Sequence, residues 1–328
     1  MESKEKKDRL LAAKKTQNDI IKKYNLKLLK IIRNGPRFFV AKCQKGQHTV
    51  IFKICLYTDK VDPRTNHGIK REALTLKFFH THPPELFRQA TPKILEHNFA
   101  GRTWYIREYL DGEPQNVKDS NFVFTTDFFS KKSADWIANF FHKLHYTSHR
   151  FPSKQKAIYA KHTMETNIML IGWYKVGGYF NFPQAAEKIK YFLFKHESLF
   201  DTYQNVLTHY EPYASHFFKY NDDDFYLIDW ENVDWGNPAH DISIIWNRAF
   251  TRPEWQKFLL KQFMKHISFE KDFKDLFSVE LVLQGVSNID YFNQTRHPAE
   301  KPIKKKAIAF YRNNVVKAIN GKLDIFKK

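Results

Sequence analysis

The sequence has little of what would direct a chain into a membrane or out of the cell. No apolar run approaches the roughly 18–20 residues that a helix needs to cross a bilayer. The N-terminus, MESKEKKDRLLAAKK, is charged where a secretory signal would be apolar. Two cysteines, Cys43 and Cys55, fall in or beside predicted strands and need not form a disulfide. These absences predict buried thiols, no transmembrane segment and a cytoplasmic location.

Glycine is also scarce, and repeats and zinc-type spacings are missing. Eleven glycines in 328 residues offer few flexible loops. We find no internal repeat, no low-complexity linker and no Cys/His pattern typical of zinc sites. A hydrophobic content of 42% and an aromatic content of 16% allow a large core. The composition therefore predicts a globular protein, and the length suits two lobes of one fold.

Positive charge is what the sequence has in excess. The formal net charge is +19, which favours nucleotide phosphates, nucleic acid, an acidic lipid surface or an anionic substrate as partners. The lysines are spread along the chain and do not gather in one block, which is typical of a solvated surface. Binding of nucleic acid or of an acidic membrane is the alternative that the charge leaves open.

The first third of the chain predicts a sheet accompanied by helices. Helical spacing indicates an amphipathic basic helix over 1–24 and a second helix over 68–80. Short apolar runs separated by turn residues predict strands at 26–32, 37–42, 49–56, 92–99 and 104–109.

One lysine stands among the apolar residues of the third predicted strand. The run 50–54 alternates as a strand does, and Lys53 is its only charged residue. Because lysine is rarely buried without a partner, we look for a carboxylate, and Glu72 in the helix that follows offers one. The alternative is an edge-strand lysine that points to water.

The remainder of the chain is mainly helical in pattern. Periodic apolar residues predict helices at 136–145, 183–204, 242–250, 255–267, 276–291 and 307–317.

Between these helices, 206–245 carries the strongest local signal. An apolar strand ends at His209, a loop carries Glu211 and His216, and an Asn/Asp-rich turn at 221–224 precedes a second strand that delivers Asp229 at its end. A strand-end carboxylate that faces loop groups of a neighbouring strand is a common way to build a metal-phosphate site. The alternative for Asp229 is a carboxylate that caps the turn.

These residues, in this order and spacing, resemble the catalytic core of the aminoglycoside phosphotransferase and choline kinase-like family. That family has His-Gly-Asp, then four residues and Asn, and about thirteen residues later Ile-Asp-Trp/Phe-Glu, followed by Gly-x-Pro and an Asp that opens a helix. Here Glu211 stands at the position of the catalytic Asp and His216 at that of the Asn, and 228–231 reads Ile-Asp-Trp-Glu. The resemblance implies an α+β, bilobal protein-kinase-like fold, with an antiparallel sheet lobe at 1–110 and a mainly helical lobe at 111–328.

The resemblance also implies the catalytic and metal-binding residues. Glu211 would orient the attacking hydroxyl as a base, with His209 and Asp241 completing the catalytic loop. Asp241 would support that loop, and its place at a helix start also makes it a candidate N-cap. Asp229 and His216 would hold Mg²⁺, and the softer imidazole makes Mn²⁺ an alternative.

The nucleotide contacts follow from the same resemblance. Lys53 would touch the α- and β-phosphates and Glu72 would orient it. A turn with a single glycine, Gly35, would cover the phosphates. The adenine would meet the backbone of three residues where the lobes join: Glu108, Tyr109 and Leu110.

The sequence therefore predicts an enzyme that moves the γ-phosphate of ATP to a hydroxyl of a small molecule. The alternative is a catalytically impaired kinase-like protein that binds a nucleotide or a partner. No residue identifies the acceptor.

Overall fold

The computed structural model describes residues 2–58, 63–82, 84–152, 158–180, 182, 184–221 and 224–326. Two residues of the predicted turn, Asp222 and Asp223, lie outside the described residues. The chain divides into two compact units, and the first contains Met1–Asp111 together with Ile228–Val233. The second contains Gly112–Leu227 and Asp234–Lys328.

The first unit is built on a five-stranded antiparallel sheet with the strand order β1-β2-β3-β5-β4. Its strands are β1 (Leu26–Asn34), β2 (Phe38–Lys45), β3 (His48–Cys55), β4 (Ile94–Asn98) and β5 (Trp104–Glu108). The five predicted strands are therefore present. Cys43 and Cys55 are both buried as thiols.

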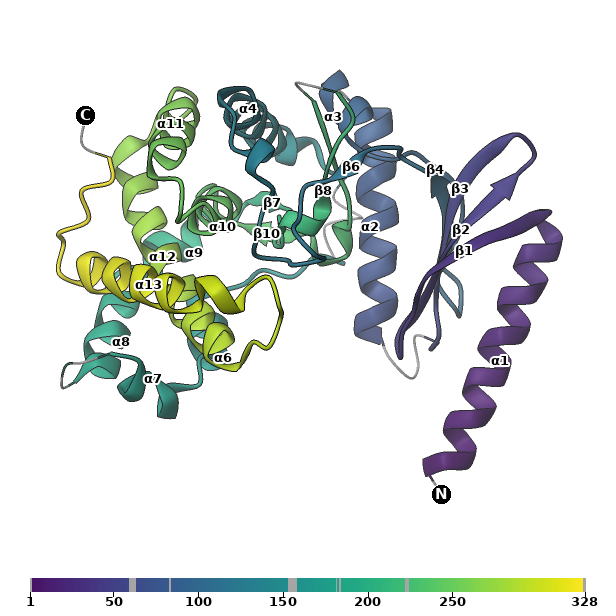
Figure 1. Ribbon diagram of the computed structural model, residues 1–328, viewed down its shortest axis with the longest axis horizontal. Coiled ribbons are helices and arrows are strands. Elements are labelled where there is room, and N and C mark those ends of the chain that lie inside the picture. Colours follow the sequence, from purple (N-terminus) through teal and green to yellow (C-terminus); the bar gives the residue numbers. More distant parts are fainter. Residues whose placement is uncertain are drawn as a thin grey trace. The chain divides into compact units, whose positions relative to one another are not determined.

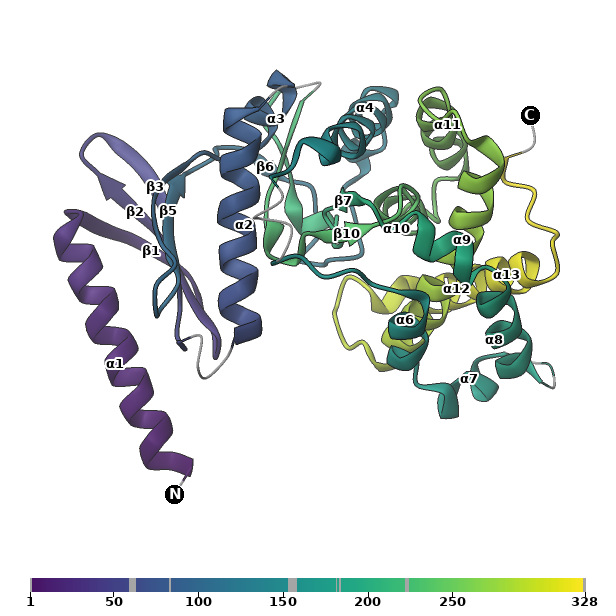
Figure 2. The same cartoon turned by 180° about the vertical axis from the view of Figure 1, so that it is seen from behind.

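Two helices cover opposite faces of this sheet, α1 (Glu2–Lys23) and α2 (Pro63–Thr81) (Figure 1, Figure 2). A third, α3 (Glu85–Ala90), follows α2. Alternate residues of β3 face opposite ways, so Phe52 and Ile54 join Ile20 of α1 in one core cluster. Cys55 joins Ile69 of α2 in another. The same alternation turns the side chain of Lys53 toward α2.

The second unit is mainly helical (Figure 1). Its helices are α4 (Lys131–Thr147), α6 (Met164–Leu170), α7 (Trp173–Tyr179), α8 (Ala185–Lys195), α9 (Glu197–Thr202), α10 (His240–Arg248), α11 (Pro253–Met264), α12 (Glu270–Gln294) and α13 (Lys304–Ile319). The predicted helix at 183–204 is two helices, because the backbone leaves helical geometry at His196. The α+β bilobal fold expected from the sequence is thus confirmed.

Two small sheets correct the strand pairing that the sequence predicted. The strand before His209 is β7 (Val206–Thr208), and it pairs with β10 (Asp234–Gly236). The strand before Asp229 is β9 (Phe225–Leu227), which pairs with β8 (Phe217–Lys219), and β8 pairs in turn with β6 (Glu113–Pro114). The strands that precede His209 and Asp229 are therefore not neighbours. The sequence did not reveal this pairing, because β8 and β10 are only three residues long and carry no periodic signal.

None of the helices over the described residues combines the length and hydropathy of a membrane span.

Candidate functional site

Lys53 is the centre of a group of charged side chains in the first unit. Its side chain is only 6% exposed, and its Nζ lies 2.8 Å from Oε2 of Glu72 on α2. The same atom lies 3.2 Å from Oδ1 of Asp229 and 2.8 Å from Oε2 of Glu231. The predicted partner of Lys53 is therefore in contact with it. Glu231 is part of the Ile-Asp-Trp-Glu run, but no pattern in the sequence separately indicated that it belongs to the site.

The three carboxylates around Lys53 outnumber their shared cation. Oxygen atoms of Glu72, Asp229 and Glu231 all lie within 4.8 Å of one another. Although burial alone would lower it, the surrounding carboxylates hold the pKa of Lys53 well above its ordinary value. Burial, together with the charges of Asp229 and Glu231, raises the pKa of Glu72 in spite of Lys53. The group is therefore short of positive charge.

The backbone around Asp229 is fixed against α2. Asp229 has a left-handed φ of 67°, a conformation that Asp and Asn tolerate better than other non-glycine residues. The next residue, Trp230, is fully buried, and its ring centroid lies 4.8 Å from that of Phe79. At Gly68 of α2, an added Cβ would lie 3.2 Å from the carbonyl oxygen of Glu231, so glycine permits this close approach. Packing on α2 thus aims Asp229 and Glu231 at Lys53.

Cations also gather at the turn that contains Gly35. Gly35 donates its N–H to the carbonyl oxygen of Phe38 at 3.1 Å and does not have a positive φ. The guanidinium carbons of Arg33 and Arg37 lie 4.7 and 5.7 Å from the centre of the Phe38 ring, and Nζ of Lys53 lies 5.1 Å from it. The sequence did not single out these arginines, because only the fold brings them close to the lysine of β3.

Two of the three backbone N–H groups at 108–110 already donate hydrogen bonds to other backbone carbonyls of the first unit. The N–H of Glu108 donates to the carbonyl of Lys93 at 3.0 Å, and that of Tyr109 donates to the carbonyl of Thr49 at 3.4 Å. Of these three residues, Leu110 is the one whose N–H has no acceptor among the described residues. A base bound here would therefore use the N–H of Leu110.

In the second unit, Asp241 holds the loop that carries the predicted catalytic residues. Its carboxylate accepts the backbone N–H of His209 at 2.8 Å and that of Tyr210 at 3.0 Å. Tyr210 has a φ of 72°, which is strained for a bulky residue, and these two bonds stabilise it. The N-cap of α10 is Ala239, so the candidate role of Asp241 as an N-cap is wrong.

His216 stabilises the backbone of the same loop. Its Nδ1 lies 2.7 Å from the carbonyl oxygen of Glu211, and because a carbonyl only accepts, this nitrogen carries the proton. Its ring stacks on Tyr213 at a centroid distance of 5.4 Å. Over the described residues, the one group of three potential metal ligands is that around Lys53, and His216 is not part of it. The metal-binding role of His216 stays a prediction.

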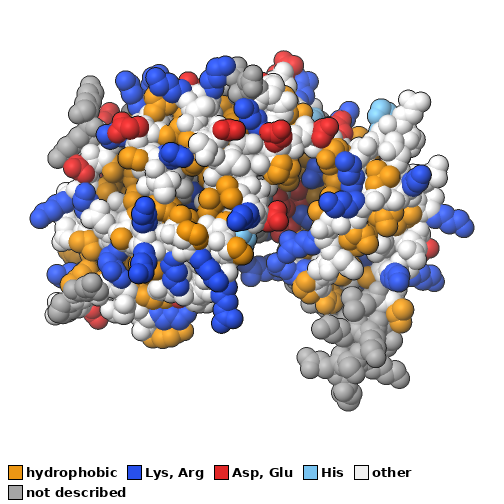
Figure 3. Space-filling view, in the orientation of Figure 1, with side chains coloured by type: hydrophobic (Ala, Val, Ile, Leu, Met, Phe, Trp, Pro, Cys, Tyr) orange, Lys and Arg blue, Asp and Glu red, His pale blue; other side chains and the backbone are white. Residues whose placement is uncertain are grey.

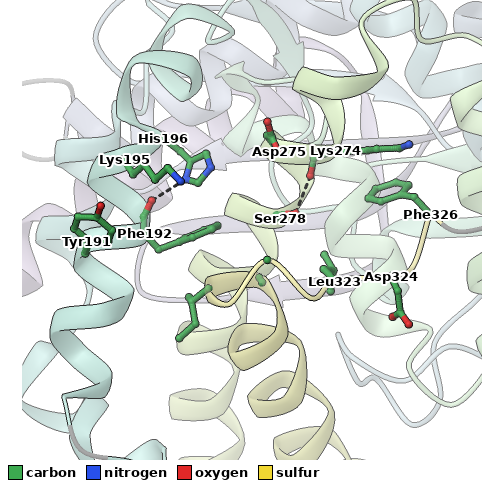
Figure 4. Close-up of a pocket in the computed structure, with 13 residues that line it drawn as sticks. Tyr191, Phe192, Lys195, His196, Lys274, Asp275, Ser278, Leu323, Asp324 and Phe326 are labelled. Atoms are coloured by element: carbon green, nitrogen blue, oxygen red, sulfur yellow. Dashed lines mark hydrogen bonds between the residues drawn. The ribbon is translucent and has the colours of Figure 1, made fainter.

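Glu211 lines a cavity of about 260 Å³ within the second unit. The cavity lies beside the strained loop and next to helices α10 and α12, and its polar walls include Tyr210, Tyr213, His240 and Arg248. A larger cavity, of about 490 Å³, lies between α8, α12 and the C-terminal segment (Figure 4). None of the predicted site residues lines it, so the cavity at Glu211 is the candidate for acceptor binding.

A buried ion pair forms part of the wall of the cavity at Glu211. Nδ1 of His240 lies 3.0 Å from Oε2 of Glu280, which is fixed further by Asn237. Although burial lowers it, the Glu280 carboxylate outweighs burial and raises the pKa of His240 to about 9. Burial also raises the pKa of the adjacent Asp241, to about 6.

We expect this pair to make stability depend on pH between 6.5 and 9. Folded His240 keeps its proton up to a pKa of about 9, whereas the unfolded chain loses it near 6.5. The contribution of this proton to the free energy of unfolding is therefore complete below pH 6.5 and is lost as the pH rises through 9. At its maximum this contribution is about 3 kcal/mol. Urea denaturation at pH 6.5, 7.5 and 9 measures it. The Glu280→Gln variant is the control, because without the carboxylate the decrease should largely disappear. An equal decrease in both proteins would show that other groups titrate.

The basic side chains are spread over the face of the protein that Figure 3 shows. Lysine and arginine appear across the visible face of both units (Figure 3). The distribution on this face singles out no patch for nucleic acid or an acidic membrane, and such binding stays an untested prediction.

Comparisons with known proteins agree with this geometry. The family model described as the phosphotransferase enzyme family matches residues 35–269. Among solved structures, the GDP complex of aminoglycoside 2'-phosphotransferase-IIIa is similar, with a TM-score of 0.57 and 12% identity over 91% of this chain and 98% of that one. Macrolide 2'-phosphotransferase MphH from Brachybacterium faecium has a TM-score of 0.53 and 15% identity, over 88% of this chain and 96% of its own.

Spectinomycin phosphotransferase in complex with ADP and spectinomycin has a TM-score of 0.54 and 13% identity, over 94% of this chain and 98% of its own. No curated protein sequence matches. At these identities the solved structures show the fold, whereas the family model covers most of the chain. The chain therefore belongs to the phosphotransferase enzyme family and has its protein-kinase-like fold.

Proposed function

We propose that the protein transfers the γ-phosphoryl group of ATP to a hydroxyl of a small molecule. The observation that carries this proposal is the contact of Lys53 with Glu72 and Asp229 at 2.8 and 3.2 Å. A buried lysine held by a helix carboxylate is the arrangement that positions nucleotide phosphates in kinase-like enzymes. Arg33 and Arg37 add positive charge at the neighbouring turn, which suits a polyphosphate. Nucleotides occupy several of the similar structures, as GDP or ADP complexes.

The carboxylates of the first unit fit a divalent cation. When all are ionised, three carboxylates and one ammonium carry a formal charge of −2, and hard cations prefer carboxylate oxygen. Asp229 and Glu231, which are more exposed than Glu72, would hold Mg²⁺ or Mn²⁺. When bound, the ion would neutralise phosphate charge.

On the acceptor side, Glu211 is the proposed base. Glu211 lines the cavity, and Asp241 and His216 fix the backbone of the loop that carries it. A carboxylate held in this way can orient a hydroxyl and accept its proton. The longer side chain of Glu211, compared with the family's Asp, places the carboxylate about one bond further from the backbone.

A second candidate function is nucleotide binding without transfer. It is favoured by the two departures from the family pattern, Glu211 and His216, and by the use of His216 Nδ1 to hold the loop backbone. Under this hypothesis the first unit binds nucleotide, and no hydroxyl compound is phosphorylated.

Replacing Glu211 with glutamine separates the two candidates. We expect Glu211→Gln to lower phosphoryl transfer by roughly 100- to 10,000-fold, because the amide cannot accept the proton. Binding of Mg-ATP, measured by calorimetry, should be unchanged, because the nucleotide contacts belong to other residues. An assay of ADP formation with a panel of hydroxyl compounds, together with detection of the phosphorylated product, provides the rates. Full transfer by the variant would remove Glu211 from the mechanism, and nucleotide binding without any transfer by the wild type would favour the second candidate.

A further inference from the structure

Arg248 is a buried cation in the wall of the cavity at Glu211. It is the last residue of α10 and is 6% exposed. Its guanidinium lies between two rings, 3.9 Å from the centre of Phe122 and 4.1 Å from that of Tyr213. Both rings pack against the guanidinium, whose N–H groups donate within its own plane.

Only some of the N–H groups of the Arg248 guanidinium find acceptors among the described residues. Nη1 donates to the carbonyl oxygen of Asn121 at 2.7 Å, whereas the buried Nε has no acceptor. No carboxylate of the described residues lies within ion-pairing distance of Arg248. Glu280, which lines the same cavity, is engaged by His240 and Asn237. The charge of Glu211, which lines the same cavity, acts on Arg248 but forms no ion pair with it over the described residues. A buried cation without an ion-pair partner is costly, and a carboxylate or phosphate group supplies one.

The dimensions and lining of the cavity limit what can bind. A volume of about 260 Å³ lies below the range of roughly 300–1,000 Å³ that is typical of sites for drug-sized ligands. Apolar side chains, including Ile171 and Leu283, alternate with neutral polar ones such as Ser287 and Asn288. The positive charge of Arg248 disfavours an ammonium group, and its planar fork matches an oxyanion.

We propose, building on the function proposed above, that the acceptor is a small hydroxy compound with a carboxylate or phosphate group, which Arg248 binds. The acceptor hydroxyl would lie toward Glu211. Its oxygen forms the new bond to the γ-phosphorus of ATP, the bond from that phosphorus to the β-phosphate oxygen breaks, and ADP leaves. The hydroxyl proton passes to Glu211. The acceptor would thus be of opposite charge to an amino sugar.

Binding of matched ligands to the wild-type protein tests this proposal without requiring transfer. On one ring skeleton, the ligands are glucuronate, glucose 6-phosphate, glucose and glucosamine. On a smaller skeleton, they are glycerate, glycerol 3-phosphate and glycerol. We expect the anionic members of at least one series to bind about 10- to 100-fold more tightly than the neutral member, with glucosamine weakest. Comparison of the acids with the phosphates distinguishes the two sources of negative charge.

Variants then assign the preference to Arg248. Arg248→Gln should abolish the preference for the anionic ligand, and Arg248→Lys should retain part of it, because the charge remains and the planar fork is lost. The double variant Lys53→Met with Glu72→Gln, which leaves no uncompensated charge at Glu72, should retain the preference in full, and this excludes binding at the phosphate site of the first unit. Circular dichroism checks the fold of each variant, and if Arg248→Gln does not fold, the wild-type ligand series and Arg248→Lys decide.

The proposal is overturned if neither series prefers its anions, or if Arg248→Gln keeps the preference. Failure of the Arg248 proposal can be told apart from failure of the proposed phosphotransferase function, because ligand binding is measured without nucleotide. Anion-selective binding with no phosphoryl transfer would contradict only the proposed function. Transfer to neutral or cationic acceptors, with no anion preference, would contradict only the assignment of Arg248.

Discussion

Asp229→Asn should abolish phosphoryl transfer and leave the fold intact. Asparagine keeps the size of the side chain and tolerates the left-handed φ of 67° found here, so the substitution removes mainly the charge. We propose that this charge holds the divalent cation, whose stabilisation of phosphate charge is worth several kcal/mol. The expected loss is at least about a thousandfold in kcat/KM, since each 1.36 kcal/mol corresponds to a factor of ten.

The measurement is a steady-state transfer assay, combined with thermal denaturation of the same samples. Asp229→Ala serves as the comparison, because alanine loses the charge and is also strained in the left-handed region by about 1–2 kcal/mol. Both variants should be inactive, and only the alanine variant should lose stability through its backbone. Transfer by Asp229→Asn within a few-fold of wild type would contradict the proposed role of Asp229.

Lys53→Met should reduce both activity and stability. The variant leaves Glu72, which is 2% exposed, buried without its cation at 2.8 Å. Breaking a buried pair by removing one partner typically costs about 3–5 kcal/mol. Transfer should fall roughly 100- to 1,000-fold, because a charged group that stabilises the phosphates is lost.

A double variant separates the two effects. Lys53→Met with Glu72→Gln leaves no uncompensated charge at Glu72 and should recover much of the lost stability while staying inactive. Asp229 and Glu231 are partly exposed and can remain hydrated in both proteins. Urea denaturation gives the free energies of unfolding. If Lys53→Met is as stable as wild type, or if the double variant is no more stable than the single one, Lys53 does not compensate Glu72.

The part of the site that could be predicted from the sequence rests on local pattern. Strand alternation placed Lys53 among apolar neighbours, and the lack of a partner nearby pointed to Glu72 in the following helix. The order of elements then gave the antiparallel sheet and the helical remainder. Both kinds of inference work because a strand's alternation and a helix's periodicity are written into adjacent residues.

The rest depends on contacts between distant segments. Glu231 reaches Lys53 because Trp230 and Gly68 bring its segment onto α2, which no local pattern encodes. Asp241 supports the loop through two backbone N–H groups, although in the sequence its position near the start of a helix resembles that of an N-cap. Arg248 is an ordinary basic residue in the sequence, and only the fold shows that it is buried between two rings.

The central claim is that one nucleotide polyphosphate binds at Lys53 with a cation on Asp229. Crystals grown with ATP and Mn²⁺ test it most directly, because anomalous scattering locates the metal. We predict phosphate oxygens in contact with Nζ of Lys53 and an anomalous peak coordinated by the carboxylate of Asp229. A nucleotide bound elsewhere, or a metal peak away from Asp229, would contradict the claim.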